Sequence, residues 1–256
     1  SVMTGALFGD IVGSVYEFRP VKTADFPLFS RRSCFTDDTV LTVATADALI
    51  SGAGYGKKYR EYYRLYPDAG YGGMFHRWAG NPSAGPYGSY GNGSAMRVSP
   101  IGYAFGTLDG VVREAERSAA VTHNHPEGIR GAQAVAAAVF LARTGTPKEE
   151  LRRFLQTRFG YDLSRRLDDI RPSYGFDVTC QGSVPESLLA FFESDSCEDA
   201  VRKAVSLGGD ADTMGCIAGA VAQAFYGLPA DLEKRVLGML TPKLREVTIK
   251  FREHYE

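Results

Sequence analysis

Several features that would assign this chain to a common functional class are missing from its sequence. The four cysteines are scattered and form no Cys-x-x-Cys pair, which argues against a zinc site or a disulfide framework and indicates free thiols. The net charge is −1 and no long basic run occurs, so nucleic acid has no electrostatic support as a partner. No apolar run is long enough to span a membrane, and no basic leader marks a signal peptide. We therefore expect a cytoplasmic protein without a membrane partner.

Strand patterns are also nearly absent. The segment from Phe176 to Cys180 is the only weak strand candidate, and no repeating strand–helix–strand rhythm occurs, which excludes a Rossmann or barrel fold. The hydrophobic content of 44% is sufficient for a large core. Because helical spacing of apolar residues dominates, we predict an all-α fold. The expected architecture is one domain, residues 1–256, forming an orthogonal helical array with its functional groups in a cleft at helix ends.

Helix positions follow from apolar spacing and from capping signals. Gly5, Gly9 and Gly13 form an i,i+4 row in the first helix, which would let another backbone approach closely. Serine or threonine before the helical run predicts helix starts at four further places, namely Thr146, Ser183, Ser196 and Thr241. The helices that we expect cover residues 4–16, 40–50, 57–66, 98–105, 107–121, 129–143, 147–159, 187–193, 198–206, 216–225 and 242–254.

Two short acidic segments precede apolar helices and share the same chemistry. The first is Thr36-Asp37-Asp38-Thr39, and the second is Asp210-Ala211-Asp212-Thr213 after two glycines. Asp and Thr are good helix caps, so capping alone would account for one carboxylate in each segment. Four carboxylates with neighbouring threonine hydroxyls form an all-oxygen set, which suits Mg²⁺, Mn²⁺ or Ca²⁺ rather than zinc. We therefore favour a metal site over two solvated caps.

Residues 67–93 break the helical pattern and are rich in glycine, proline and tyrosine. A connection this long inside a compact domain is usually a binding loop. It leads into Tyr87-Gly88-Ser89-Tyr90-Gly91-Asn92-Gly93, where glycines expose backbone N–H groups that could cradle a phosphate. It is not a Walker loop, because no Gly-Lys-Ser/Thr closes it. The substrate-binding residues that we predict are Gly72, Gly73, Ser89, Tyr90, Gly91, Asn92 and His123.

The histidines leave several interpretations open. His123 and His125 lie two residues apart, which suits a turn better than one face of a helix. Such a turn could contact a ligand, could be a plain surface turn, or could serve a metal. No nucleophile-elbow sequence supports Ser/His/Asp catalysis, and no local motif supports a cysteine nucleophile.

Taken together, these motifs resemble the ADP-ribosylglycohydrolases, the family that includes the dinitrogenase-reductase-activating glycohydrolase and the ADP-ribosyl-acceptor hydrolases. The resemblance runs from residue 5 to about residue 227. It rests on four segments in order, namely Gly5-Ala6-Leu7-Phe8-Gly9-Asp10-Ile11-Val12-Gly13, Thr36-Asp37-Asp38-Thr39, Ser89-Tyr90-Gly91-Asn92-Gly93-Ser94-Ala95-Met96-Arg97 and Gly208-Gly209-Asp210-Ala211-Asp212-Thr213. It implies an all-helical enzyme that releases free ADP-ribose from a modified acceptor and holds two Mg²⁺ or Mn²⁺ ions in a cleft.

The resemblance also implies roles for particular residues. The metal ligands would be Thr36, Asp37, Asp38, Asp210, Asp212 and Thr213, and the catalytic residues would be Asp37, Asp38, Asp212 and Glu17. Glu17 falls where hydrolases of serine-linked ADP-ribose carry a gating glutamate, and His123 resembles a ligand-contacting histidine. The acceptor, serine or arginine, stays open at this point. A metal-dependent phosphoester hydrolase and a non-catalytic ADP-ribose-binding relative are the alternatives.

Overall fold

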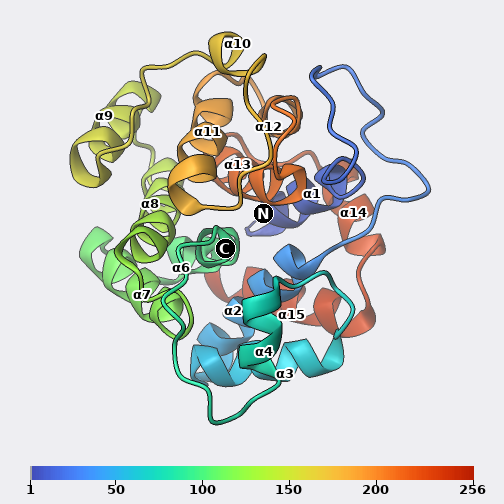
Figure 1. The fold of residues 1–256 in the computed structure, drawn as a ribbon, viewed down its shortest axis with the longest axis vertical. Coiled ribbons are helices and arrows are strands. Elements are labelled where there is room, and N and C mark those ends of the chain that lie inside the picture. Colours follow the sequence, from blue (N-terminus) through green and yellow to red (C-terminus); the bar gives the residue numbers. More distant parts are fainter. Residues whose placement is uncertain (1) are drawn as a thin grey trace.

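A computed structural model describes residues 2–256, and the regular secondary structure of this part consists of α-helices joined by loops (Figure 1). The helices are α1 (Thr4–Gly13), α2 (Asp37–Ser51), α3 (Tyr55–Leu65), α4 (Gly73–Ala79), α5 (Gly93–Met96), α6 (Ser99–Ala104), α7 (Leu108–Ala120), α8 (Pro126–Arg143), α9 (Lys148–Phe159), α10 (Leu167–Ile170), α11 (Cys180–Phe192), α12 (Cys197–Val205), α13 (Ala211–Tyr226), α14 (Ala230–Gly238) and α15 (Pro242–Tyr255). This confirms the predicted all-α fold.

The strand prediction for Phe176 to Cys180 is wrong. Within residues 2–256, this segment forms only one isolated antiparallel bridge, between Thr179 and Gly91. The apolar residues that suggested a strand, Phe176 and Val178, are instead exposed. A single bridge fastens the segment to the glycine-rich loop without building a sheet.

The packing of α1 against α13 fixes the centre of the molecule. A Cβ atom on Gly9 would lie 1.9 Å from the Gly215 carbonyl oxygen, and one on Gly5 would lie 2.4 Å from the Gly219 carbonyl oxygen. The two backbones therefore touch directly, as the predicted glycine row requires. We call this glycine contact the α1–α13 seam. It brings Asp10 of α1 close to Asp212 at the start of α13.

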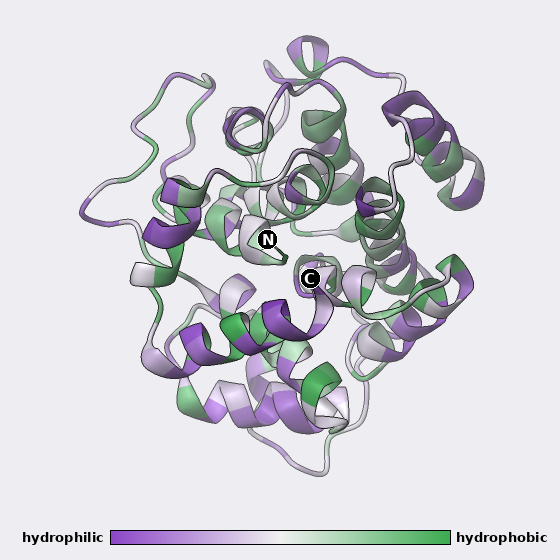
Figure 2. Ribbon diagram, turned by 180° about the vertical axis from the view of Figure 1, so that it is seen from behind, coloured by the Kyte–Doolittle hydropathy of each residue, from purple (hydrophilic) through white to green (hydrophobic). Residues whose placement is uncertain are grey.

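The remaining helices enclose this pair. Helices α12, α11 and α8 pack on α13, and α2 packs on α1 (Figure 1). Helix α8 is rich in alanine and valine, and its residues from Ala134 to Val139 are fully buried, as its composition predicts. Figure 2 shows the complementary pattern, with hydrophilic residues along the outer helices and paler or green interior helices. In the described chain, no helix combines the length and the apolar character that crossing a membrane requires.

Two of the predicted helix caps are confirmed. Ser196 precedes α12, and its side chain accepts a hydrogen bond from the backbone N–H of Asp199. Thr241 precedes α15, accepts from the N–H of Leu244, and is followed by a proline in the first turn. Each hydroxyl satisfies one of the helix N–H groups that has no partner within the helix.

The two other predicted caps are wrong. Helix α9 begins at Lys148 with no side-chain cap, so Thr146 does not open it. Helix α11 begins at Cys180 rather than after Ser183, because Thr179 accepts from the N–H of Gly182 and caps the chain one turn earlier. Proline then lies inside α11 at position 185, where its missing N–H removes one helical hydrogen bond.

Four helices lie in regions that the sequence pattern left as connections. Helix α4 lies within the glycine-rich stretch 67–93, α5 follows directly after it, and α10 and α14 lie between predicted helices. Each has nine residues or fewer, which is too short for apolar periodicity to stand out. The four cysteines are free thiols, and only Cys34 is exposed.

Candidate metal and ligand cleft

The two acidic helix starts lie beside each other, as their shared chemistry predicts. Carboxylate oxygens of Asp10, Asp38 and Asp212 lie within 4.8 Å of one another, and so do those of Glu17, Asp210 and Asp212. Asp212 belongs to both groups. The residues come from α1, the loop after it, the start of α2 and the start of α13. A set of carboxylates at this spacing can hold divalent cations.

Asp10 was missed by the sequence analysis as a site residue. Its carboxylate accepts hydrogen bonds from the backbone N–H and the hydroxyl of Thr36 at 2.8 and 2.6 Å, and from the N–H and hydroxyl of Thr39 at 3.1 and 2.6 Å. It therefore orients the first turn of α2, which carries Asp38. The available signal was an acidic residue between apolar neighbours in a buried helix, because such a carboxylate needs partners.

Thr36 links the carboxylates to each other. Its hydroxyl oxygen lies 2.6 Å from Asp10 Oδ1, 3.0 Å from Asp38 Oδ2 and 3.3 Å from Asp212 Oδ2. It also accepts from the Asp38 N–H and so caps α2, which begins at Asp37, three residues before the expected start at residue 40. Capping and contact with the acidic cluster are thus performed by the same oxygen.

Unpaired oxygens show that the acidic residues fit a cation. Asp38 Oδ1 and Asp212 Oδ1 are buried and have no hydrogen-bond partner within residues 2–256. A buried carboxylate oxygen without a donor is costly, because no water replaces the lost hydration. Bound cations would supply the missing partner, and an all-oxygen donor set is the kind that hard cations select.

Burial makes these carboxyl groups weak acids. Desolvation, partly offset by hydrogen bonds from Thr36, raises the pKa of Asp10 to about 6. Burial and then the nearby Asp210 raise the pKa of Glu17 to about 7. Burial also raises the pKa of Asp38 and of Asp212 well above the usual value, with neighbouring carboxylates adding to the effect. Without a cation, the cluster therefore retains protons that acidic residues normally release.

The metal-free protein should become less stable as the pH rises from about 4 to about 7. Over this range Asp10 and Glu17 keep protons in the folded state, since their pKa values of about 6 and about 7 exceed the ordinary 3.8 and 4.5. The unfolded chain binds fewer protons there, so stability falls with rising pH. We expect Tm in a chelator to drop by roughly 5 °C across this range, and Mg²⁺ to raise Tm more near neutral pH than near pH 4.5. Thermal unfolding with chelator and with MgCl₂ measures both; a Tm independent of pH and metal would contradict the cluster's role.

The glycine-rich loop forms a second wall of the cleft, next to the acidic cluster. The backbone N–H of Asn92 donates to the Val178 carbonyl at 2.7 Å, and its side-chain amide donates to Asp210 Oδ2 at 2.9 Å. Ser89 Oγ accepts from the N–H of Gly91 at 3.1 Å. Asn92 therefore joins the loop directly to the acidic cluster.

A cleft of about 340 Å³ lies between these walls, which is within the range of small-molecule sites. It brings together most of the predicted site residues and adds several that the sequence did not indicate. The predicted residues lining it are Glu17, Asp37, Asp38, Gly72, Gly73, Ser89, Gly91, Asn92, His123, Asp210, Asp212 and Thr213. The additional ones are Leu41, Gly70, Met74, Phe75, Tyr87, Gly93, Met96, Arg97 and Val178.

Two predicted residues lie elsewhere in the described structure. Thr36 sits behind the carboxylates that it contacts, and Tyr90 is 47% exposed with its ring 5.0 Å from that of His125. Tyr87 is the tyrosine of this loop that lines the cleft, and its ring lies 5.8 Å from that of His123. Tyr87 rather than Tyr90 is therefore the tyrosine of this loop that can contact a ligand in the cleft, and no local sequence pattern reveals its orientation.

His123 is held as a neutral imidazole beside the glycine-rich loop. Burial, with a further contribution from Arg97, lowers its pKa well below the usual value. Its Nδ1 lies 2.6 Å from Thr122 Oγ1, and this hydroxyl oxygen accepts from the buried Arg97 guanidinium at 2.9 Å. A Cβ atom on Gly93 would lie 3.2 Å from His123 Nε2. The second ring nitrogen therefore faces the loop.

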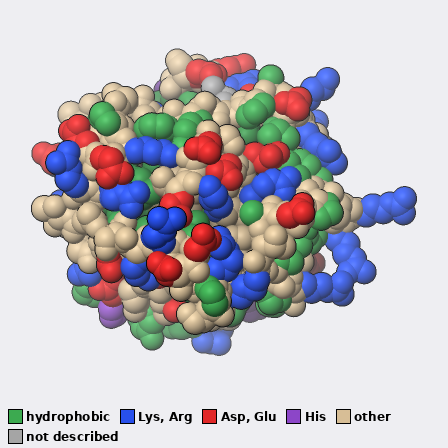
Figure 3. Space-filling view, turned by 90° about the horizontal axis from the view of Figure 1, so that it is seen from above, with side chains coloured by type: hydrophobic (Ala, Val, Ile, Leu, Met, Phe, Trp, Pro, Cys, Tyr) green, Lys and Arg blue, Asp and Glu red, His purple; other side chains and the backbone are tan. Residues whose placement is uncertain are grey.

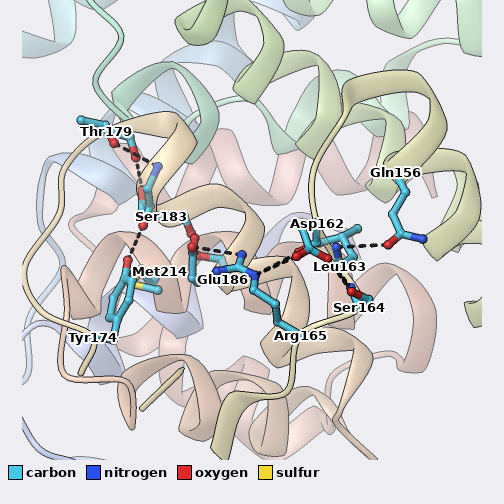
Figure 4. A network of polar contacts seen from close by, with 12 residues as sticks. Gln156, Asp162, Leu163, Ser164, Arg165, Tyr174, Thr179, Ser183, Glu186 and Met214 are labelled. Atoms are coloured by element: carbon cyan, nitrogen blue, oxygen red, sulfur yellow. Dashed lines mark hydrogen bonds and ion pairs between the residues drawn. The ribbon is translucent and has the colours of Figure 1, made fainter. Parts of the chain in front are cut away.

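The third wall is the segment that precedes α11, and polar contacts hold it in place (Figure 4). The Tyr174 hydroxyl donates to the Gly182 carbonyl at 2.5 Å, and the Ser183 hydroxyl donates to the Thr179 carbonyl at 2.5 Å. Ser183 Oγ also accepts from the Asn92 amide at 3.1 Å. These contacts connect the segment to the glycine-rich loop and, through Asn92, to Asp210.

Comparison with known proteins identifies the protein family to which the chain belongs. The ADP-ribosylglycohydrolase family model matches residues 1–254, and the chain belongs to this family of enzymes. It is similar to ADP-ribosylhydrolase ARH3 of Bos taurus, at 27% identity over 88% of this chain and 84% of that protein. It is also similar to ADP-ribosylarginine hydrolase Tri1 of Pseudomonas putida (strain GB-1), at 29% identity over 88% of this chain and 70% of that protein.

A solved structure supports the same conclusion. A chain of an ADP-ribosylglycohydrolase-related protein complex superposes with a TM-score of 0.74 at 25% identity, covering 99% of this chain and 96% of that one. The family resemblance of the four sequence segments and the predicted fold class are thus both confirmed.

Proposed function

We propose that this protein hydrolyses the bond between the distal ribose of ADP-ribose and a modified amino-acid side chain, releasing free ADP-ribose and the unmodified acceptor. The observation that carries the proposal is the pair of acidic groups sharing Asp212 in a cleft that the glycine-rich loop also lines. The name of the Pseudomonas relative specifies arginine, whereas that of the bovine relative specifies no acceptor, so serine and arginine are both carried into the test. The free thiols support the cytosol as the proposed compartment.

The acidic cluster would hold two Mg²⁺ or Mn²⁺ ions. The proposed ligands are Thr36, Asp37, Asp38, Asp210, Asp212 and Thr213, and the position of Asp10 in one acidic group adds it as a ligand or as the residue that orients Thr36. When bound, the cations would hold vicinal ribose hydroxyls and polarise a water molecule. The unpaired oxygens of Asp38 and Asp212 are the positions that require such a partner.

The other residues of the cleft bind and orient the substrate. Backbone N–H groups of the loop that bond no other atom of the described chain, such as that of Gly93, and the neutral His123 suit the diphosphate, because neither carries a competing negative charge. Carboxylates beside the reacting carbon stabilise the positive charge that develops as the glycosidic bond breaks. Glu17 lies at the outer side of the acidic cluster, where it would shape or gate the acceptor's approach.

The test is identification of the products. The protein is incubated with peptides carrying ADP-ribose on serine or on arginine, with Mg²⁺ and with chelator, and the products are read by mass spectrometry. We expect free ADP-ribose and the unmodified peptide from one of the two substrates, only with metal. Release of AMP or inorganic phosphate would support a phosphoester hydrolase instead. Binding without release from either linkage would support a non-catalytic ADP-ribose-binding protein.

Substitution of Gly91 by valine should weaken ADP-ribose binding by about tenfold or more, which corresponds to about 1.4 kcal/mol. A Cβ atom at this position would lie 3.2 Å from Ser89 Oγ and 3.7 Å from His123 Nε2, so the branched side chain would enter the space that the loop leaves for ligand. Titration calorimetry with ADP-ribose measures the loss. Gly85→Val serves as the control, because Gly85 lies in the same stretch with no atom within 4 Å of its added Cβ. If Gly91→Val and the unsubstituted protein bind ADP-ribose with equal affinity, the loop around Gly91 does not bind the phosphates.

A further inference from the structure

Exposed hydrophobic side chains gather at the mouth of the cleft. In the described chain, the large hydrophobic residues that are clearly exposed are Phe18, Leu65, Met74, Tyr90, Phe176 and Val178. Met74 and Val178 line the cleft, Phe18 follows the cleft residue Glu17, and Tyr90 lies between Ser89 and Gly91. Only Leu65, at the end of α3, lies apart from these segments. Grouped exposure of this kind marks a surface that binds a partner.

The two most exposed of these residues lie together at the acidic end of the cleft. Phe18 is 81% exposed and Phe176 is 55% exposed, and their ring centroids are 6.4 Å apart. Phe18 follows Glu17 directly. The segment before Phe176 lies over the second acidic motif, since a Cβ atom on Gly209 would be 2.5 Å from the Tyr174 ring. We call Phe18 and Phe176 the aromatic pair.

Hydrogen bonds from Lys22 join the two backbone segments that carry the aromatic pair. The Lys22 ammonium, in the loop that carries Phe18, donates to the backbone carbonyls of Arg171 and Leu207 at 2.7 Å each, and also to that of Tyr174. These contacts join the loop after α1 to the segment before Phe176. The two backbone segments that carry the exposed rings are therefore held next to each other.

The loop that carries Phe18 also carries positive charge. Arg19, Arg31 and Arg32 lie in the same loop, are exposed, and form no ion pair with any residue of the described chain. Lys and Arg side chains project from one edge of the molecule in Figure 3, on the side where this loop lies in Figure 1. Unpaired arginines in the loop that carries Phe18 favour an acidic partner over a neutral one.

We propose that the aromatic pair and these arginines bind the acceptor polypeptide that carries the ADP-ribose. The inference rests on the proposed function: with the ADP-ribose in the cleft and its reacting carbon at the acidic cluster, the acceptor must emerge beside Glu17, where the aromatic pair stands. The fitting partner is an acidic segment with an apolar side chain next to the modified residue. The apolar residue packs on Phe18 and Phe176, and the acidic residues face the arginines.

The test compares two substrates that carry the same ADP-ribosylated amino acid and differ only in the polypeptide around it. One is the free ADP-ribosylated amino acid, and the other is an acidic peptide with an apolar residue beside that amino acid. The double variant Phe18→Ala/Phe176→Ala should raise the KM of the peptide about tenfold, because aromatic anchors dominate such contacts, while kcat/KM for the free amino acid changes less than about twofold. Leu65→Ala, with a side chain 50% exposed on α3, is the matched control and should change neither value.

A second arm tests the charge. Arg31→Gln/Arg32→Gln, or added salt, should raise the KM of the acidic peptide and leave that of a peptide with basic flanks unchanged or lower. Equal KM values for the peptide in the aromatic double variant and the unsubstituted protein would overturn the inference while the proposed function stands. If neither substrate is hydrolysed, the proposed function fails. In that case, the affinity of the same variants for the ADP-ribosylated peptide, measured by fluorescence anisotropy, tests the docking surface separately from the reaction.

Discussion

Replacing Asp212 by asparagine is expected to lower turnover by about a thousandfold or more, the scale typical for loss of a central electrostatic group. Asp212 is the one residue shared by both acidic groups, and one of its oxygens is buried without a partner. The amide keeps the size of the side chain but removes the negative charge that a hard cation selects. Calorimetric titration with Mg²⁺ or Mn²⁺ should show the loss of a site, and the product assay should show the loss of ADP-ribose release.

The control for this variant is Asp109→Asn. Asp109 is the second residue of α7, as Asp212 is the second residue of α13, but it is exposed on the outer surface. It should change neither metal stoichiometry nor turnover. Asp38→Asn should behave as Asp212→Asn does, because Asp38 Oδ1 is the other unpartnered oxygen. If both variants bind metal with unchanged stoichiometry and affinity, the acidic cluster is not the metal site.

Replacing Gly9 by valine should prevent stable folding, with a loss of about 4 kcal/mol or more in the free energy of unfolding. The added Cβ would lie 1.9 Å from the Gly215 carbonyl oxygen and 2.7 Å from the Cys216 nitrogen. Both atoms belong to the backbone of α13, so no side-chain rotation relieves the overlap and the helices must separate. Circular dichroism during thermal unfolding measures the effect.

Gly238→Ala is the matched control for the helix seam. Gly238 is also a helical glycine, at the end of α14, and nothing lies within 4 Å of a Cβ atom placed there. Alanine at this position should leave Tm unchanged or raise it slightly, because it favours the helix. A folded Gly9→Val protein with a Tm close to that of the unsubstituted protein would contradict the direct backbone contact.

The sequence was informative where chemistry and spacing are local. The Gly5, Gly9 and Gly13 row indicated a close helix contact, and the two Asp–Thr motifs indicated helix starts with an acidic function. In both cases the signal lies within a few helical turns of one segment. The comparison with known proteins confirmed the family resemblance that the same segments carry.

Long-range placement could not be predicted in the same way. Asp10 contacts Thr36 and Thr39 across more than twenty residues of chain, at distances that no periodicity encodes. Tyr87 rather than Tyr90 faces the cleft, and two neighbouring tyrosines in a glycine-rich loop give no sign of which one turns inward. The Ser183 cap failed for a related reason: two capping signals compete, and the earlier one at Thr179 is stabilised by Asp177 at 2.7 Å.

The α1–α13 seam has a practical consequence for redesigning the protein. Because Asp10 and Asp212 are each one to three residues from glycines in backbone contact, the main chain sets the spacing of their carboxylates rather than adjustable side chains. A library aimed at new acceptors should leave this seam intact. Exposed positions such as Phe18, Arg19, Phe176 and Val178 are the better place for diversity, since they do not support the helix contact. Selection there would alter which acceptors bind while the geometry of the acidic cluster is kept unchanged.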